Sequence, residues 1–378
     1  MTGKKIRVLH IAQAAGGVDR YLRMLLKYMD KEQFENIVVF SQNFNKNDYK
    51  GLVDGYETVE MYRAIGINDI KSVFQIRKLI KEYEPDVVYV HSSKAGALGR
   101  LANIGIKNIC IYNPHGWAFN MRCSGKKQFL YACIEKMAAH FCDKIICISN
   151  AEKQSALDKK ICKENKLQII YNGIDIDDYE NSIHGKIKRC DIGVPADAFV
   201  IGMVGRICKQ KAPDIFIQAA EMIKKELPNA YFILVGDGDM TKSIKKYAEE
   251  NDLSDSLYIT GWVDNPMDYI EIFDVACLLS RWEGFGLVVP EYMLCRKPVI
   301  ACNVDALPDI IENEQSGILV EVDNYVEVYE NVMRLYANSE WKIRLINTAY
   351  KKVFDDFNAR RVSFETDNLI KSMMGKLR

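Results

Sequence analysis

The chain has 378 residues, 48% of them hydrophobic, which is enough for two or three domains that each bury a core. Such a composition excludes a disordered or fibrous protein. The 51 basic and 51 acidic side chains cancel, so no nucleic-acid partner is expected. The charge is unevenly placed, because residues 1–189 contain 30 Lys and Arg against 21 Asp and Glu, and the remainder contains the reverse. The sequence therefore predicts two domains of opposite net charge.

The N-terminal segment and the cysteine pattern predict a cytoplasmic protein. The first apolar stretch, residues 6–11, is too short for the core of a signal peptide. No stretch reaches the roughly 18 apolar residues that a membrane span requires. The eleven cysteines form no Cys-x-x-Cys pair and only five histidines are present, so buried reduced thiols are expected and a zinc site is not.

In the first half, short β-branched segments alternate with longer segments of helical period. This pattern is typical of parallel sheets that helices cover on both faces. Residues 69–83, for example, place Val73, Ile76, Ile80 and Tyr83 on one helical face. Strands are expected at residues 7–12, 36–40, 86–91, 108–112, 144–148 and 168–171.

A polar stretch at residues 174–194 indicates a linker, and the alternating pattern restarts after it. A helix is expected at residues 341–357, and a final helix without a strand to cover is expected at residues 358–378. We therefore predict an α/β protein with two doubly wound domains, whose ligands should collect beyond the carboxyl ends of the strands. Strands of the second half are expected at residues 199–204, 231–235, 257–260, 275–279, 298–301 and 317–320.

The loop after the first strand does not fit a nicotinamide enzyme. Such an enzyme requires Gly-x-Gly-x-x-Gly here and an acidic residue after the second strand, and both are missing. The P-loop pattern is also absent. Gly16 and Gly17 still follow the strand directly, where bare backbone can approach an anion at a helix N-terminus. Taken alone, this pair indicates a tight turn as readily as a phosphate contact.

Two cations follow the first strand of the second half. Arg206 and Lys211 lie in the loop before Pro213, which suits a first helical position. A guanidinium fork beside a compact ammonium suits a diphosphate. For either residue alone, an ordinary solvated cation is the favoured interpretation. Gly236 opens a second glycine-rich turn, after the next strand.

Two carboxylates follow a later strand. Glu283 precedes a glycine loop, and Glu291 lies about one turn inside the helix expected at residues 287–295. The two acids could therefore contact different parts of one ligand. As a pair of acids alone they are weak evidence, because helix surfaces often carry such spacing.

Taken together, these motifs resemble the retaining glycosyltransferases of family 4, which have the GT-B architecture of two Rossmann-like domains facing a cleft. The resemblance covers nearly the whole chain. The segment at residues 90–100, with the His115-Gly116-Trp117 motif, looks most like bacterial transferases of capsule, exopolysaccharide or O-antigen assembly. The resemblance implies domains at residues 1–185, for the acceptor, and 186–357, for the donor. It also implies that a C-terminal helix, residues 358–378, returns to the first domain.

The resemblance also implies roles for single residues. Arg206 and Lys211, or Lys209 in place of Lys211, should hold the donor diphosphate. Glu283 should bind the sugar hydroxyls, Glu291 the ribose hydroxyls, and His115 should contact the sugar from the first domain. Further donor contacts are expected from the backbone of Gly16, Gly17, Gly236, Phe285, Gly286 and Leu287.

Two positions depart from the family pattern. Ala212 follows the lysine where the family usually has glycine, and Asp305 stands in place of another family glycine. An acid next to the donor would need a hydroxyl or a cation as its partner.

The implied activity is transfer of a sugar, with retention, from a nucleotide-diphosphate sugar to a saccharide acceptor. A UDP-sugar is favoured, with no metal or other cofactor. The implied acceptor is linked to undecaprenyl diphosphate, so a peripheral contact with an anionic membrane is expected. Basic residues mix with apolar ones near residues 122–127 and 153–166, and these segments are candidates for that contact. A merely solvated basic face remains an alternative for them. A UDP-sugar 2-epimerase and a non-catalytic nucleotide-sugar sensor remain alternatives for the whole protein.

Overall fold

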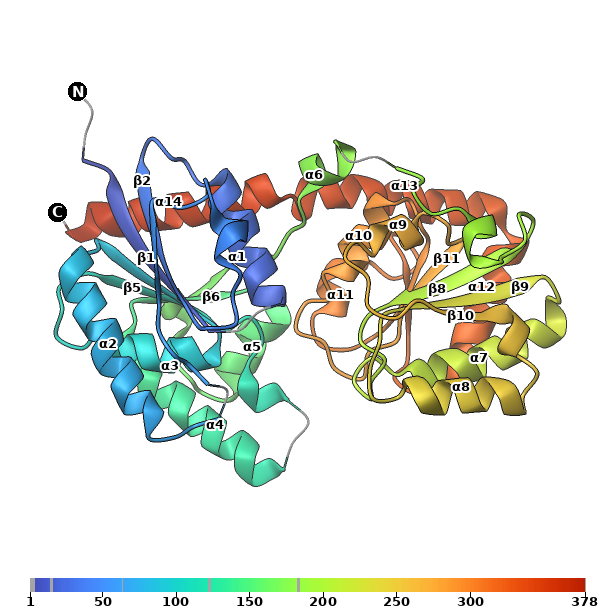
Figure 1. Ribbon diagram of the computed structural model, residues 1–378, viewed down its shortest axis with the longest axis horizontal. Helices are drawn as coiled ribbons and strands as arrows, with labels where there is room; N and C mark the ends of the chain where they lie inside the picture. The colour runs from blue at the N-terminus through green and yellow to red at the C-terminus, as the bar shows by residue number, and fades with distance from the viewer. Residues whose placement is uncertain (1–3, 14–15, 63, 122–123, 182–183, 378) are drawn as a thin grey trace. The chain divides into compact units, whose positions relative to one another are not determined.

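The computed structural model describes residues 4–13, 16–62, 64–121, 124–181 and 184–377 (Figure 1). The chain divides into two compact units. Unit 1 comprises Met1–Asp175 and Asn358–Arg378, and unit 2 comprises Ile176–Phe357. Each unit is an α/β domain with one parallel sheet, as the sequence predicts.

Unit 1 is built on a seven-stranded parallel sheet with the order β3-β2-β1-β4-β5-β6-β7. Six of these strands match predicted segments. The seventh, β3, was missed because it is a short edge strand, Gly-Tyr-Glu-Thr, that lacks an apolar run. The strands are β1 (Ile6–Ala12), β2 (Phe34–Phe40), β3 (Gly55–Thr58), β4 (Val87–His91), β5 (Ile109–Asn113), β6 (Lys144–Cys147) and β7 (Leu167–Ile169).

Helices cover both faces of this sheet. On one face α1 (Gly17–Tyr28) and α14 (Ala359–Leu377) pack over a core that includes Leu22, Leu25 and Val362. The C-terminal helix thus belongs to unit 1, and Ser363 Oγ donates to the Leu25 carbonyl at 3.0 Å. The other face carries α2 (Asn68–Tyr83), α3 (Ser93–Ala102), α4 (Gly125–Ala138) and α5 (Asn150–Asp158).

Unit 2 has a six-stranded parallel sheet with the order β10-β9-β8-β11-β12-β13. The strands are β8 (Phe199–Val204), β9 (Ala230–Val235), β10 (Leu257–Ile259), β11 (Val275–Leu278), β12 (Val299–Cys302) and β13 (Ile318–Val320). The helices are α6 (Ile176–Glu180), α7 (Pro213–Glu226), α8 (Thr241–Glu250), α9 (Met267–Ile270), α10 (Val288–Leu294), α11 (Leu307–Ile310), α12 (Tyr325–Ala337) and α13 (Ser339–Asp356). Short 3-10 turns complete the two units: η1 (Lys46–Tyr49), η2 (Ala118–Asn120), η3 (Ala139–Phe141), η4 (Glu164–Lys166), η5 (Arg189–Ile192) and η6 (Ser254–Ser256).

The boundary between the units lies ten residues before the predicted one. We expected the second domain to begin at residue 186, whereas unit 2 begins at Ile176. Residues between these two positions contact Glu271 of unit 2, which accepts hydrogen bonds from the Tyr179 hydroxyl at 3.4 Å, from His184 Nδ1 at 2.5 Å and from the Gly185 amide at 2.6 Å. A polar stretch in the sequence marks a linker only roughly, since long-range contacts of this kind decide to which unit it belongs.

Because all strands within a sheet are parallel, their carboxyl ends lie along one edge in each unit. In unit 1 this edge carries the loops that follow β1, β4 and β5, with Gly16, Ser92 and His115. In unit 2 it carries the loops that follow β8, β9, β11 and β12. The predicted site residues are therefore found at the carboxyl edges. Among the described residues, no helix is long and apolar enough to cross a membrane.

Candidate active site

The loops after β8 and β9 in unit 2 are joined backbone to backbone. The Gly205 amide donates to the Val235 carbonyl at 3.0 Å, and the Ile207 amide donates to the Asp237 carbonyl at 3.0 Å. Gly236 has φ 140°, and a Cβ built on it would overlap the Gly205 carbonyl oxygen. Only glycine allows the two loops to approach this closely.

Lys211 and Glu283, which the sequence assigned to one site, form an ion pair across the loops that follow β8 and β11. Their side chains are only 16% and 10% exposed. The Ser280 hydroxyl donates to the same carboxylate oxygen of Glu283 at 3.0 Å. The Glu283 amide donates to Asp305 Oδ2 at 2.8 Å, so both ends of this residue are fixed. The strand order has brought a cation and a carboxylate from distant segments to one point.

Arg206 is exposed at the same edge, and its Nη2 donates to Gln210 Oε1 at 3.3 Å. Gln210 in turn donates to the Trp282 carbonyl at 3.0 Å. This side-chain bridge, which the sequence reading missed, ties the Arg206 loop to the Glu283 loop. Lys209 differs from Lys211, because its side chain is exposed and its carbonyl accepts from Arg281 Nη1 at 2.8 Å.

The segment before α10 contains the remaining predicted donor contacts. The Phe285 ring is buried and packs edge to face on Phe357, with 5.9 Å between ring centroids. Gly286 has φ 81°, and Leu287 directly precedes α10. Glu291 lies on α10 with only 2% of its surface exposed, and its contact with a ribose stays a prediction.

The two departures from the family pattern keep the backbone conformation that glycine favours. Ala212 has φ 53° and Asp305 has φ 49°, both in the left-handed region. We expected the Asp305 carboxylate to need a hydroxyl or a cation. It accepts a backbone hydrogen bond from Glu283 at 2.8 Å, so the added side chain helps to hold a predicted site residue.

In unit 1, Gly16 and Gly17 open α1 next to open space. Gly16 has φ 90°, a conformation that disfavours other residues. A Cβ built on either glycine would meet no described heavy atom within 4 Å. Packing within the described part of the chain therefore does not require glycine at position 17.

His115 lies in the loop after β5 with a left-handed backbone, φ 52°. The Asn113 side chain stabilises this turn, because its Oδ1 accepts from the His115 amide at 3.0 Å. The edge of the ring packs against Tyr21 of α1, with 4.5 Å between centroids, which connects His115 to the helix that Gly16 and Gly17 begin. Burial lowers the pKa of His115 to about 3, so the ring is neutral at physiological pH.

Behind His115 lies a row of imidazoles that the sequence reading did not connect. His115 Nε2 is 3.2 Å from His91 Nδ1, and His91 Nε2 is 3.3 Å from His10 Nδ1. His10 Nε2 is 3.1 Å from Asn36 Oδ1. His10 and His91 are fully buried, and burial lowers both pKa values, that of His10 to about 4. The only sign of this row in the sequence is that His10 lies within one predicted strand and His91 ends another.

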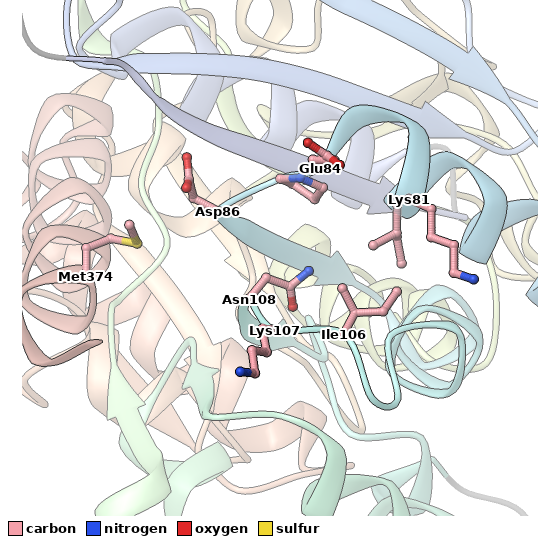
Figure 2. Close-up of a pocket in the computed structure, with 9 residues that line it drawn as sticks. Lys81, Glu84, Asp86, Ile106, Lys107, Asn108 and Met374 are labelled. Carbon is pink, nitrogen blue, oxygen red and sulfur yellow. The ribbon is translucent and has the colours of Figure 1, made fainter. Parts of the chain in front are cut away.

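A pocket of about 600 Å³ lies elsewhere in unit 1, at the amino ends of β4 and β5. Figure 2 shows Lys81, Glu84 and Lys107 around it, with Met374 of α14 at one side. None of the predicted site residues lines this pocket. Its position at the opposite edge from His115 separates it from the candidate site.

Neither a metal cluster nor a disulfide is found in the part of the chain that the structure describes. Its cysteines are free, and no three His, Cys, Asp or Glu side chains gather as metal ligands would. In unit 2 the described candidate residues are the glycine-rich loops, Arg206, the Lys211–Glu283 ion pair and Glu291, and unit 1 separately carries His115. Such loops on a Rossmann-like domain suit an anionic ligand that also carries hydroxyl groups.

Comparison with known proteins identifies the family to which the chain belongs. The family model described as Glycosyltransferase Family 4 matches residues 15–178, and the model described as Glycosyl transferases group 1 matches residues 186–352. An uncharacterized 41.2 kDa protein in the cps region of Klebsiella pneumoniae is 31% identical, over 86% of this chain and 88% of its own. The chain therefore belongs to glycosyltransferase family 4, and it is a glycosyltransferase.

Two further similarities concern function and fold. The Escherichia coli enzyme UDP-Gal:alpha-D-GlcNAc-diphosphoundecaprenol alpha-1,3-galactosyltransferase is 28% identical over 99% of both chains. The structure of Anabaena HepE in complex with UDP and glucose has a TM-score of 0.82 and 20% identity, over 97% of this chain and 100% of its own. This structural likeness shows the GT-B fold.

Proposed function

We propose that this glycosyltransferase moves a sugar from a UDP-sugar to a saccharide linked to undecaprenyl diphosphate, with retention, in the synthesis of a bacterial surface polysaccharide. The Escherichia coli relative, whose name specifies these two substrate types, supports the substrate classes. The Klebsiella pneumoniae relative, encoded in a cps region, supports the biosynthetic setting. The observation that carries the proposal is the Lys211–Glu283 pair at the carboxyl edge of unit 2.

The pair suits a sugar diphosphate because such a ligand is anionic at one end and rich in hydroxyls at the other. Lys211 and Arg206 hold the diphosphate, and Glu283 accepts hydrogen bonds from sugar hydroxyls. We favour Lys211 over Lys209 as the phosphate ligand, because its ammonium is aimed at Glu283 while the Lys209 side chain is exposed. Glu291 and the backbone of residues 285–287 complete the donor site.

Departure of the nucleoside diphosphate builds negative charge on the phosphate oxygens and positive charge at the anomeric carbon. Arg206 and Lys211 stabilise the phosphate oxygens electrostatically, in place of a metal ion. Loss of one preorganised donor of this kind costs on the order of 3 kcal/mol, or about a hundredfold in rate. No covalent nucleophile is assigned, since retention follows from attack on the face that the diphosphate leaves.

The proposed membrane contact lies on α4. The exposed side chains of Phe129 (72%), Leu130 (51%) and Met137 (63%) accompany exposed Lys126 and Lys127 on this helix. Apolar and basic side chains together favour a surface that carries anionic lipid. The protein would then be peripheral at the cytoplasmic face of the membrane, where its lipid-linked acceptor is held.

The other predicted basic positions offer less to a membrane. Lys153 pairs with Glu164 at 2.7 Å, and Lys166 Nζ donates to the carbonyls of Ala139 and Cys142 at 2.8 and 2.7 Å. These are two of the five lysines in residues 153–166. None of the exposed large apolar side chains lies in this segment, all of which the structure describes, so α4 is the better candidate. Arg122, at the start of the other predicted segment, lies outside the described residues.

The test is acceptor-dependent release of UDP by the purified protein. UDP-sugars are supplied with and without a lipid-diphosphate-linked N-acetylhexosamine, and UDP and the elongated lipid are both measured. Lys211→Ala and Glu283→Ala should each lower the rate about a hundredfold or more. Lys209→Ala is the matched control and should stay within a fewfold of wild type.

Three results would contradict the proposal. A new sugar nucleotide without an elongated acceptor would indicate the epimerase alternative. Binding of UDP-sugar without turnover of any acceptor would indicate a sensor. Equal losses in Lys209→Ala and Lys211→Ala would overturn the assignment of the phosphate ligand.

A further inference from the structure

The row of imidazoles behind His115 crosses the sheet of unit 1 in strand order. Asn36 lies on β2, His10 on β1 and His91 at the end of β4, and His115 follows β5. These four strands are neighbours in the order β2-β1-β4-β5. His10 lies on the same face of β1 as Val8 and Ala12, which are two positions away on either side and belong to the core beneath α1 and α14, so the row runs on that face. The row therefore extends from a half-buried ring at the carboxyl edge into the core.

With Asn36 Oδ1 facing His10 Nε2, a neutral row has one self-consistent set of proton positions. Asn36 presents its carbonyl oxygen, so His10 Nε2 must carry the proton and His10 Nδ1 is an acceptor. His91 Nε2 then donates to His10 Nδ1, which leaves His91 Nδ1 as an acceptor. His115 Nε2 donates to His91 Nδ1, and the remaining lone pair of the row is on His115 Nδ1.

The row cannot easily carry a charge. An imidazolium in its interior would be wholly buried, and Asn36 is an amide that cannot take up the proton. The described side chains that pack against the imidazole rings are neutral as well. They are Tyr21 on α1, Tyr89 on β4 and Asn113 on β5, with Thr366 of α14 behind Tyr21. The Asp54 carboxylate accepts from the backbone amide of Asn36 at 2.7 Å. Burial raises the pKa of Tyr21 and of Tyr89, which keeps both phenols protonated.

We infer that Asn36, His10 and His91 are positioning residues that hold His115 as its neutral Nε2–H tautomer, so that His115 Nδ1 accepts a hydrogen bond from a substrate sugar hydroxyl. This inference rests on the proposed function, which supplies a sugar as ligand. A neutral acceptor nitrogen selects a hydroxyl donor and offers no charge to a phosphate. The row therefore assigns His115 to sugar recognition and leaves the diphosphate to unit 2.

The first experiment reads the tautomer directly. Ring-nitrogen NMR of the full-length protein labelled with ¹⁵N-histidine is recorded from pH 6 to pH 8, and His115→Gln assigns the signal. We expect a protonated Nε2 and an unprotonated Nδ1 at His115 over the whole range. An Nδ1–H tautomer or an imidazolium at pH 7 would overturn the inference, even in an active transferase.

The second experiment adds one carboxylate to the far end of the row. Asn36→Asp can stabilise a proton on His10, and His10 Nδ1–H would then donate to His91 Nε2. The protons of His91 and His115 would each move to Nδ1, so His115 Nδ1 would become a donor. We expect kcat/KM of Asn36→Asp to fall about tenfold per pH unit below the new pKa, because one proton is taken up, while wild type stays flat from pH 6 to 8.

A matched control is His140→Gln, which changes an exposed histidine that bonds only to backbone carbonyls among the described contacts. Its pH profile should equal that of wild type. A flat profile for a folded, active Asn36→Asp would contradict the inference. Absence of sugar transfer by wild type, with the expected tautomer observed, would instead contradict the proposed function, so the two failures are distinguishable.

Discussion

Two glycines of the candidate residues, Gly236 and Gly17, differ in the physical reason for having no side chain. At Gly236 the Gly205 carbonyl leaves no room for a side chain, so the loops themselves require glycine. At Gly17 the space around a built Cβ is open in the described structure. A glycine that packing does not require, at the start of a helix on the carboxyl edge, is consistent with close approach of a ligand.

Gly17→Ala should therefore separate stability from activity. We expect it to raise the free energy of unfolding by up to about 1 kcal/mol, since alanine is the better helix residue. The methyl group should nevertheless lower the rate of sugar transfer at least tenfold if the backbone contacts a substrate. Denaturant unfolding and UDP release measure the two effects, and unchanged activity would show that Gly17 only forms a turn.

Glu152 supports the turn that carries His115 and predicts a dependence of stability on pH. Its carboxylate accepts from the Ile148 amide at 2.9 Å, and its carbonyl accepts from the indole of Trp117 at 2.9 Å. Burial raises the pKa of Glu152 from 4.5 to about 7. The folded protein thus binds this proton more tightly than the unfolded chain does.

The stabilisation from protonated Glu152 is complete below pH 4.5 and is lost as the pH rises to about 7. The amount is on the order of 3 kcal/mol. Glu152→Gln keeps a neutral side chain at every pH, so it should raise the melting temperature at pH 8 and change it little at pH 5. Thermal unfolding at both pH values tests this, and equal shifts would show that Glu152 is ionised when folded.

At the scale of elements, α4 combines a buried anchor with an exposed apolar face. Glu135 of α4 forms a buried ion pair with Arg100 of α3 at 2.8 Å and accepts from the Tyr112 hydroxyl of β5 at 2.8 Å. The Arg100 guanidinium also lies 3.8 Å from the centre of the Tyr112 ring. A fixed helix can therefore present Phe129 and Leu130 outward without collapsing them onto the core.

Replacing both Phe129 and Leu130 by Ser should weaken binding to anionic vesicles at least tenfold, since each loses roughly 1–2 kcal/mol of apolar burial. Flotation on phosphatidylglycerol liposomes at low salt measures the bound fraction. Ile343→Ser, at a position on α13 about as exposed as Leu130, is the control and should bind as wild type does. No enrichment of wild type on the vesicles would remove the proposed membrane contact.

At the scale of the molecule, the two units divide the candidate residues between them. Arg206, Lys211, Glu283 and Glu291 belong to unit 2, and His115 belongs to unit 1. If unit 2 alone holds the nucleotide, changes in the two units should affect UDP binding differently. This division gives a test that does not depend on knowing the acceptor.

UDP should raise the melting temperature of wild type more than GDP, ADP or TDP does, because the proposed donor is a UDP-sugar. A ligand at 100 times its Kd stabilises the folded protein by about 2.7 kcal/mol, so the nucleotide that binds most tightly gives the largest shift. The shift should be largely lost in Lys211→Ala and retained in His115→Gln. A thermal-shift screen with the four nucleotides measures this. Loss of the shift in both variants would mean that the nucleotide is not held by unit 2 alone.

The sequence by itself determined the architecture and the chemical types at the site. Periodicity of 2 and 3.6 residues separates strands from helices, and glycine next to a strand end marks a loop whatever the rest of the chain does. These signals are local, so they located every strand except the short polar β3 and placed Arg206, Lys211 and Glu283 in loops. The domain boundary was less accurate, because Glu271 binds residues that are 86 and 87 positions away.

Only the tertiary structure decided which side chains meet. Lys211 and Glu283 are 72 residues apart, and His10 and His91 are 81 apart. Each pair becomes adjacent because β8 neighbours β11 and β1 neighbours β4. Strand order results from packing of the whole sheet, and no local pattern around His10 or His91 encodes it. The family likeness assigned Lys211 and Glu283 to one donor site but did not predict that they pair, and the row of histidines became visible only when the sheet was assembled.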